Sequence, residues 1–280
     1  MSDRNDILQP EDYLEPRCLL CDEPYGAEPE VRAIPQRRVL EKVDEYMSRR
    51  DYDGVERTLK YWLEEARLGH DLRGELLVQN ELIGHYRKVG NKDLAFESVD
   101  EALTLLKKLD FEDSISAGTT YTNAATACNA FEDNERSIAL FEKARAVYEN
   151  HEQTDPALLG GLYNNMALTY GALKQYDEAR ALYDKALGAM GEVPNGALEQ
   201  AITWLNIADL GYLEKGPEDS AEEVEQCLSK AARLLDDPAV PKDGYYAFVC
   251  EKCAPAFAWY GYETKADELN ERAEQIYERT

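Results

Sequence analysis

The stretch Gly161–Met190, GLYNNMALTYGALKQYDEARALYDKALGAM, shows the packing positions of one helix-turn-helix unit. Its first half has a one-sided stripe at spacings of three, one and three residues: Tyr163, Met166, Ala167 and Tyr170. Its second half alternates small and large residues at spacings of four and three: Ala179, Tyr183 and Ala186. Because each bulky side chain needs a methyl-sized gap opposite it, this pattern predicts two closely packed antiparallel helices.

The same unit recurs along the chain. The residues at the Tyr170 position follow one another at steps of 40, 42, 42, 41 and 46: Tyr46, Tyr86, Cys128, Tyr170, Gly211 and Phe257. In all but the fifth unit, the packing stripe of the second helix begins nine residues later. The fifth unit fits only if the turn around Gly216 and Pro217 is four residues longer. Six units at a nearly constant step predict a stacked array with one continuous core.

The pattern resembles the tetratricopeptide repeat (TPR), whose signature is an aromatic, Leu-Gly or Leu-Ala, and Tyr, followed by Ala, an aromatic and Ala. The 42-residue step is longer than the usual repeat of about 34 residues. It is similar to the long repeats of kinesin light chain and of many bacterial TPR proteins. The resemblance implies an all-α fold, a right-handed TPR solenoid of about six helix pairs. We expect these repeats at about 36–69, 72–110, 113–151, 156–192, 196–236 and 242–280.

Residues 1–35 differ in composition from the rest, because they hold five of the eleven prolines. Closely spaced prolines do not permit a long helix. We therefore expect an irregular arm that packs on the solenoid, where it covers part of the groove or caps the first repeat. Its candidate anchors are Leu14, Leu19, Leu20 and Tyr25.

The chain is strongly acidic, with 56 acidic and 31 basic residues and a formal net charge of -25. Nucleic acids and anionic membranes repel a surface of that sign, so the charge argues against both as partners and favours a neutral or basic protein or peptide. The same acidic surface also keeps a long solenoid in solution. No apolar run of 18 residues and no basic-then-apolar leader is present in the sequence. We expect a cytoplasmic protein.

A polar set lies on the first helices of the units. Asn123, Asn165 and Asn206 occupy the same place in three successive repeats. The resemblance implies that first helices line a concave groove, where these three amides would form a row. A primary amide both donates and accepts hydrogen bonds, as an extended peptide backbone does. The candidate peptide-binding residues are Asn80, Thr122, Asn123, Thr126, Asn164, Asn165 and Asn206. Alternatively, each asparagine bonds the neighbouring helix and fixes the repeat geometry.

The sequence argues against one groove chemistry found in TPR proteins. The family's carboxylate clamp, which holds the acidic C-terminus of heat-shock chaperones, uses lysine, asparagine and arginine at groove positions. The corresponding positions here hold Leu40, Glu41, Glu81, Thr119 and Asn123. Glutamate repels a carboxylate, so we do not expect chaperone tails to bind.

Two cysteine pairs provide the one metal-like signal. Cys18 and Cys21 in CLLC, and Cys250 and Cys253 in CEKC, have the spacing that lets two thiolates reach one zinc ion. However, the repeat phase places the second pair at inward packing positions, where cysteine acts as a small hydrophobe. We therefore expect no cofactor, and a zinc-linked or redox-linked CxxC protein remains an alternative.

No catalytic arrangement is visible. The three histidines, His70, His85 and His151, lie in different repeats, and the sequence has no HExxH, no phosphate-binding glycine loop and no nucleophile elbow. We therefore expect a non-enzymatic scaffold that binds a protein or peptide in its groove. The main alternative is a signalling regulator of the Rap type, in which a TPR array closes around a short peptide.

Overall fold

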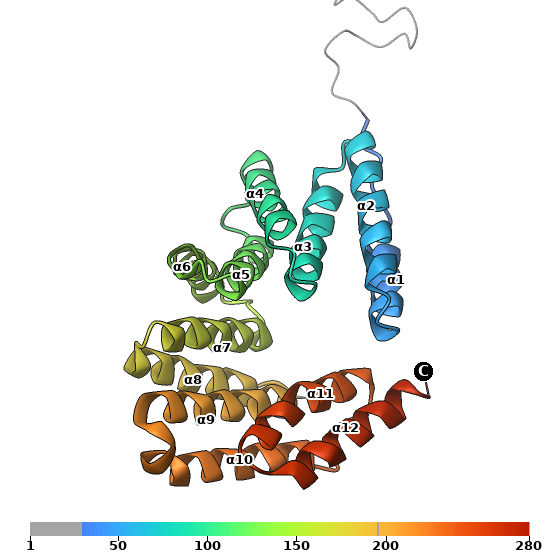
Figure 1. Ribbon diagram of the computed structural model, residues 1–280. Coiled ribbons are helices and arrows are strands. Elements are labelled where there is room, and N and C mark those ends of the chain that lie inside the picture. Colours follow the sequence, from blue (N-terminus) through green and yellow to red (C-terminus); the bar gives the residue numbers. More distant parts are fainter. Residues whose placement is uncertain (1–29, 195, 280) are drawn as a thin grey trace, which may run out of the picture.

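The computed structural model describes residues 30–194 and 196–279, and these contain twelve α-helices and no strand (Figure 1). The two helices of each repeat pack side by side, as the periodicity predicts. None of these helices combines the length and the apolar character needed to span a membrane. The helices are α1 (Gln36–Ser48), α2 (Tyr52–Leu68), α3 (Leu72–Lys88), α4 (Lys92–Lys108), α5 (Ile115–Ala130), α6 (Asn134–Asn150), α7 (Pro156–Ala172), α8 (Tyr176–Gly191), α9 (Ala197–Asp219), α10 (Ala221–Leu235), α11 (Gly244–Trp259) and α12 (Glu263–Tyr277).

Short polar side chains set many of the helix starts. Asp51 accepts a hydrogen bond from the backbone N–H of Gly54, and Asp71 accepts one from Gly74 in the same way. These bonds satisfy amide groups that have no partner inside the helix. The same kind of cap begins five other helices: Asn91, Ser114, Asp133, Asp155 and Asp243.

Glycines permit the close approach of paired helices. A Cβ on Gly118 of α5 would lie 2.2 Å from a ring carbon of Tyr148 on α6. A Cβ on Gly160 of α7 would lie 2.5 Å from the Met190 methyl group on α8. These contacts are the large-against-small packing that the sequence predicts.

The fifth repeat breaks its helical geometry where the longer turn was expected. The extra residues extend α9 to Asp219, and the helix is broken at Gly216, which has φ 81° and ψ 172°. Glycine adopts this conformation readily, and the following proline cannot donate a hydrogen bond to the preceding turn. The insertion therefore appears as a kink in a long helix, with Ser220 alone between α9 and α10.

The buried apolar residues form two clusters. The N-terminal core lies among α1 to α4 and comprises Ile34, Val39, Val43, Val55, Leu59, Ala66, Val78, Leu82, Tyr86 and Ala95. The main core runs without interruption from Leu76 on α3 to Ala273 on α12. Most of the array is therefore held by one interior, and the first two repeats share a smaller one.

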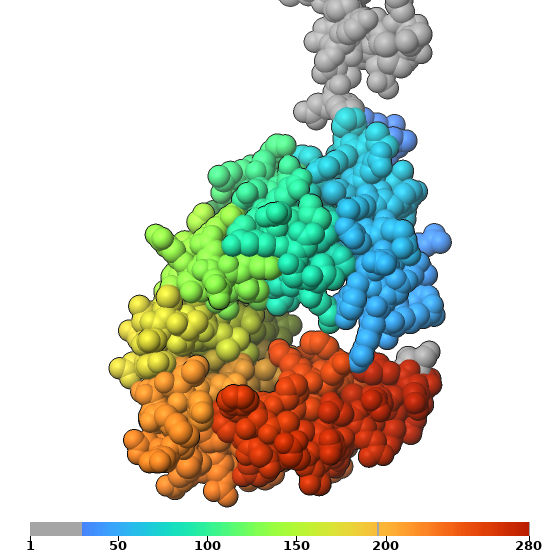
Figure 2. Space-filling view, viewed as in Figure 1, coloured from blue at the N-terminus to red at the C-terminus, as the bar shows by residue number. Residues whose placement is uncertain are grey.

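The array curves until its first and last repeats meet (Figure 1). Arg50, which follows α1, forms an ion pair with Glu251 of α11, 201 residues later in the chain. The Arg50 guanidinium also lies 5.8 Å from the ring centre of Tyr277 on α12. In the space-filling view the blue first repeat reaches the red surface of the last repeat beside a small opening (Figure 2). The described repeats therefore form a closed loop.

The part of the N-terminal arm that is described lies against the first two repeats. The backbone N–H of Arg32 donates to the Gly69 carbonyl at 2.8 Å, and that of Ile34 donates to the Asp71 carboxylate at 2.9 Å. The Ile34 side chain is buried in the N-terminal core. The predicted anchors Leu14, Leu19, Leu20 and Tyr25 lie outside the described residues.

Candidate functional site

The first helices of the repeats form one continuous surface. Helices α3, α5, α7, α9 and α11 contact one another in that order, and each also packs against the second helix of its own pair. Their remaining faces lie on the inside of the curved array (Figure 1). We call this surface the inner wall.

Four of the candidate asparagines form two bonded pairs on the inner wall. The Asn123 Nδ2 atom donates to the Asn80 Oδ1 atom at 3.1 Å. The Asn206 Nδ2 atom donates to the Asn164 Oδ1 atom at 3.2 Å. Each donor belongs to the repeat that follows the repeat of its acceptor. In its own repeat, each acceptor lies one residue before the position that corresponds to the donor. The amides therefore join repeats two and three, and repeats four and five, and this differs from the expected single row.

The amide group of Asn80 also donates its hydrogen bonds inside the protein. Its Nδ2 atom also donates to the Leu76 carbonyl and to the Thr120 hydroxyl, both at 3.0 Å. Asn123 and Asn206 each show one side-chain hydrogen bond within the described part of the chain, which leaves an amide hydrogen and a carbonyl oxygen for another ligand. Structural and binding roles are therefore compatible in these two residues.

The other three candidates differ in how their polar groups are used. The half-buried Asn165 side chain makes no hydrogen bond to any residue that the structure describes. The Thr122 hydroxyl donates to the Gly118 carbonyl, and the Thr126 hydroxyl donates to the Thr122 carbonyl, both at 2.8 Å. Threonines that bond one turn back in their own helix have satisfied their donor. Asn165 is thus the candidate whose side chain is most available.

Both amide pairs reach hollows in the inner wall. A pocket of ≈ 390 Å³ contains Asn80 and Asn123, and its other walls include Arg73, Leu77 and Glu81. A second pocket, of ≈ 440 Å³, contains Asn164 and Asn165 together with residues of the last two repeats: Glu199, Tyr245 and Lys252. Each hollow has room for a side chain and combines amide, charged and apolar groups.

The carboxyl groups of these hollows are poorly solvated. Burial raises the pKa of Glu81, and the nearby Asp44 raises it further. Burial also raises the pKa of Glu199, an effect that Lys252 opposes. The Tyr245 hydroxyl donates to the Glu199 carboxylate. A hydrogen-bond donor or a cation brought to this wall would stabilise the charged carboxylates.

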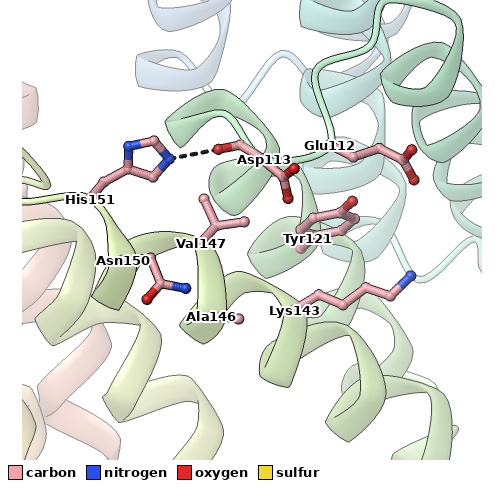
Figure 3. Close-up of a pocket in the computed structure, with 8 residues that line it drawn as sticks. All are labelled: Glu112, Asp113, Tyr121, Lys143, Ala146, Val147, Asn150 and His151. Atoms are coloured by element: carbon pink, nitrogen blue, oxygen red, sulfur yellow. Dashed lines mark hydrogen bonds between the residues drawn. The ribbon is translucent and has the colours of Figure 1, made fainter.

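A third pocket lies away from the inner wall, between α5 and α6 (Figure 3). It measures ≈ 520 Å³ and is bordered by Glu112, Asp113, Tyr121, Lys143 and His151, among others. The His151 Nε2 atom lies 2.6 Å from the Asp113 carbonyl oxygen. Burial and the two acidic residues raise the pKa of Tyr121, so its phenol stays neutral. The contact ties the loop before α5 to the end of α6.

The CEKC cysteines lie in the protein core. The exposed fractions of Cys250 and Cys253 are 0% and 1%. Burial raises the pKa of both thiols, and that of Cys253 reaches about 12. Buried neutral thiols act as small apolar groups, the packing role that their phase indicates. Cys18 and Cys21 lie outside the described residues, and the residues that are described contain no cluster of three or more metal-ligating side chains.

Comparison with known families agrees with this geometry. A tetratricopeptide repeat model matches residues 74–150 and 158–233, which together make up more than half of the chain. The chain belongs to the tetratricopeptide repeat family. No curated protein matches it.

Solved structures show the same fold. BtubC (BKLC) from P. vanneervenii is 21% identical and superposes with a TM-score of 0.60, over 71% of this chain and 78% of that one. A putative kinesin light chain from Podosopora anserina, with nearly identical TPR-like repeats, is 19% identical with a TM-score of 0.47, over 73% of this chain and 95% of that one. At these identities the BtubC likeness supports the all-α TPR solenoid fold and nothing finer.

Proposed function

We propose that this protein is a non-enzymatic, cytoplasmic scaffold whose inner wall binds an extended segment of a neutral or basic protein or peptide. TPR arrays mediate protein interactions, and that coarse role accords with the family match. The observation that supports the finer role is the set of amides in two inner-wall hollows, of which Asn165 has no hydrogen-bond partner in the described structure. An extended backbone offers alternating donors and acceptors that such amides can bind.

The charge of the wall supports the preference for a neutral or basic segment. Glu81 and Glu199 lie in the two hollows with raised pKa values, and the whole chain carries a formal charge of -25. A basic segment approaches such a surface with a favourable long-range field and stabilises its carboxylates on arrival. An acidic segment would be repelled by the same field and would destabilise the charged carboxylates.

The test is a peptide-array screen with the purified protein. Asn165→Ala removes one half-buried amide and breaks no hydrogen bond within the described structure, so its fold should be unchanged by circular dichroism. We expect it to lose several-fold in affinity for the peptides that the wild type captures. The matched control is Asn150→Ala, which changes an exposed amide at the end of α6, away from the inner wall. Full capture of every wild-type partner by Asn165→Ala would rule out the proposed groove.

A further inference from the structure

The first and last repeats touch through side chains of α1, α3, α11 and α12 and of the residues beside them. Arg50 pairs with Glu251, and the Tyr277 hydroxyl donates to the same carboxylate at 3.5 Å. On the neighbouring helices, the Lys88 ammonium lies 5.9 Å from the ring centre of Phe248 and 5.6 Å from that of Tyr52. Through these contacts, the end of α1 and the end of α3 lie against α11 and α12.

These contacts are weak by their nature. The Arg50 and Glu251 side chains are 61% and 44% exposed, and exposed ion pairs are screened by salt. The cation and ring contacts at exposed sites are of similar small strength. By contrast, neighbouring repeats share buried apolar surface. The junction between the two ends is therefore the contact most easily opened in the whole loop.

The position of this junction determines access to the inner wall. Phe248 stacks on Tyr245, with ring centres 6.2 Å apart, and Tyr245 lines the second hollow with Asn165 and Lys252. The junction thus lies beside the surface that we assign to peptide binding. When the ends touch, they close the side of the loop next to this surface. When they part, a chain can enter from that side.

We propose that Arg50, Glu251, Tyr277, Lys88 and Phe248 form an electrostatic latch that opens to admit a chain segment to the inner wall and closes around it. This regulation rests on the proposed function of the inner wall. Opening needs no local unfolding, because small changes of angle between successive repeats add up along a solenoid. This latch should open more often at high ionic strength, because salt screens the ion pair. A pair with the two charges exchanged should close the latch as well as the natural pair does.

The test measures the distance between the two ends without any ligand. Spin labels are attached at Ser48→Cys on α1 and Glu274→Cys on α12, both exposed sites, with Cys18→Ser and Cys21→Ser to remove the two cysteines outside the described residues. The remaining cysteines, Cys128, Cys227, Cys250 and Cys253, are buried. The control pair is Ser229→Cys with Glu274→Cys, on helices α10 and α12 that share the main core.

We expect one short distance at about 0.05 M salt and a broad, longer distribution at about 0.5 M. Arg50→Glu should give the long distribution at both concentrations, and Arg50→Glu with Glu251→Arg should restore the short one. The control pair should not change. Identical distributions in wild type and Arg50→Glu, or failure of the reversed pair to restore the short distance, would overturn the latch.

A second measurement separates the latch from the proposed function. A fluorescent copy of the peptide that binds best in the array screen should associate several-fold faster with Arg50→Glu than with the wild type. Equal association rates would overturn the latch and leave peptide binding intact. If no peptide binds either protein, the proposed function fails, and the label distances still decide whether the ends open.

Discussion

The N-terminal core and the main core satisfy their buried polar groups differently. In the main core, the Ser137 hydroxyl donates to the Ala125 carbonyl and the Thr154 hydroxyl donates to the Tyr148 carbonyl, both at 2.9 Å. On α3, beside the N-terminal core, the buried Gln79 Oε1 and His85 Nδ1 atoms have no hydrogen-bond partner in the described structure. A buried unsatisfied polar group costs about 1–3 kcal/mol. We therefore expect the first repeats to be the less stable end of the array.

The ion pairs show the same contrast. In the main core, Arg180 of α8 pairs with Glu214 of α9 and with Glu223 of α10, and it ties three helices together. Near the N-terminal core, Arg67 forms a single ion pair among the described residues, at 2.6 Å to the buried Glu75. Networks of several charges stabilise more than single pairs do. A stable main core with a weaker first repeat is the arrangement in which the two ends of the loop can part.

The largest effect should come from filling a tight glycine contact in the main core. Gly118→Ala places a methyl group 2.2 Å from the buried Tyr148 ring, which cannot move without displacing its neighbours. We expect the free energy of unfolding to fall by about 1–3 kcal/mol in urea denaturation. An unchanged unfolding midpoint would show that the helix pair has more space than the structure indicates.

The matched control lies on the helix between the two cores. A Cβ on Gly84 of α3 meets no atom within 4 Å. Alanine is a better helix former than glycine, so Gly84→Ala should raise the free energy of unfolding by about 0.5–1 kcal/mol. A loss of stability in Gly118→Ala and a gain in Gly84→Ala would confirm that the steric contact, and not helix propensity, determines the effect at Gly118.

The smallest effect concerns pH and the first repeats. Burial lowers the pKa of His85. The charges of Glu56 and Asp53 raise that pKa, and the charge of Lys60 lowers it further. The unfolded chain, with a histidine pKa of about 6.5, thus binds more protons than the folded chain, so stability falls as the pH drops below about 6.5. In His85→Leu, which copies Leu210 of the fifth repeat, this loss should be absent. The expected difference between wild type and variant is at most about 1.4 kcal/mol per pH unit.

Urea midpoints at pH 7.5 and 5.5 measure this difference. Hydrogen exchange at the two pH values, corrected for the intrinsic rate, should locate the loss in α2 and α3 of the wild type. Parallel pH dependences in the two proteins would contradict a destabilising role for the buried imidazole.

Much of the fold follows from the sequence because helix packing repeats on a fixed step. Each large side chain packs against a small residue of the paired helix, as Tyr148 packs against Gly118. The spacing of large and small residues in the sequence therefore indicates which helices pair. The break at Gly216 lies where the longer turn was predicted, but its form as a kink was not predictable, because glycine and proline permit both outcomes and packing decides between them. Closure of the array was not predictable, since it depends on small angles summed over all repeats.

The candidate site was predictable in part. Repeat phase placed Asn123, Asn165 and Asn206 at equivalent positions, but the bonds to Asn80 and Asn164 depend on how neighbouring helices are offset. Lys252 was missed, although it lies five residues before Phe257, as Asn165 lies five before Tyr170. The third pocket was missed because His151 and Asp113 come from different elements and meet only in the fold.

The most direct test of the inner wall is hydrogen exchange with and without a captured peptide. The account predicts slower backbone exchange in α5, α7 and α9 when the peptide is bound, with no change in α6, α8 and α10. Protection confined to those second helices, or to the pocket between α5 and α6, would contradict the central claim that the inner wall holds the partner.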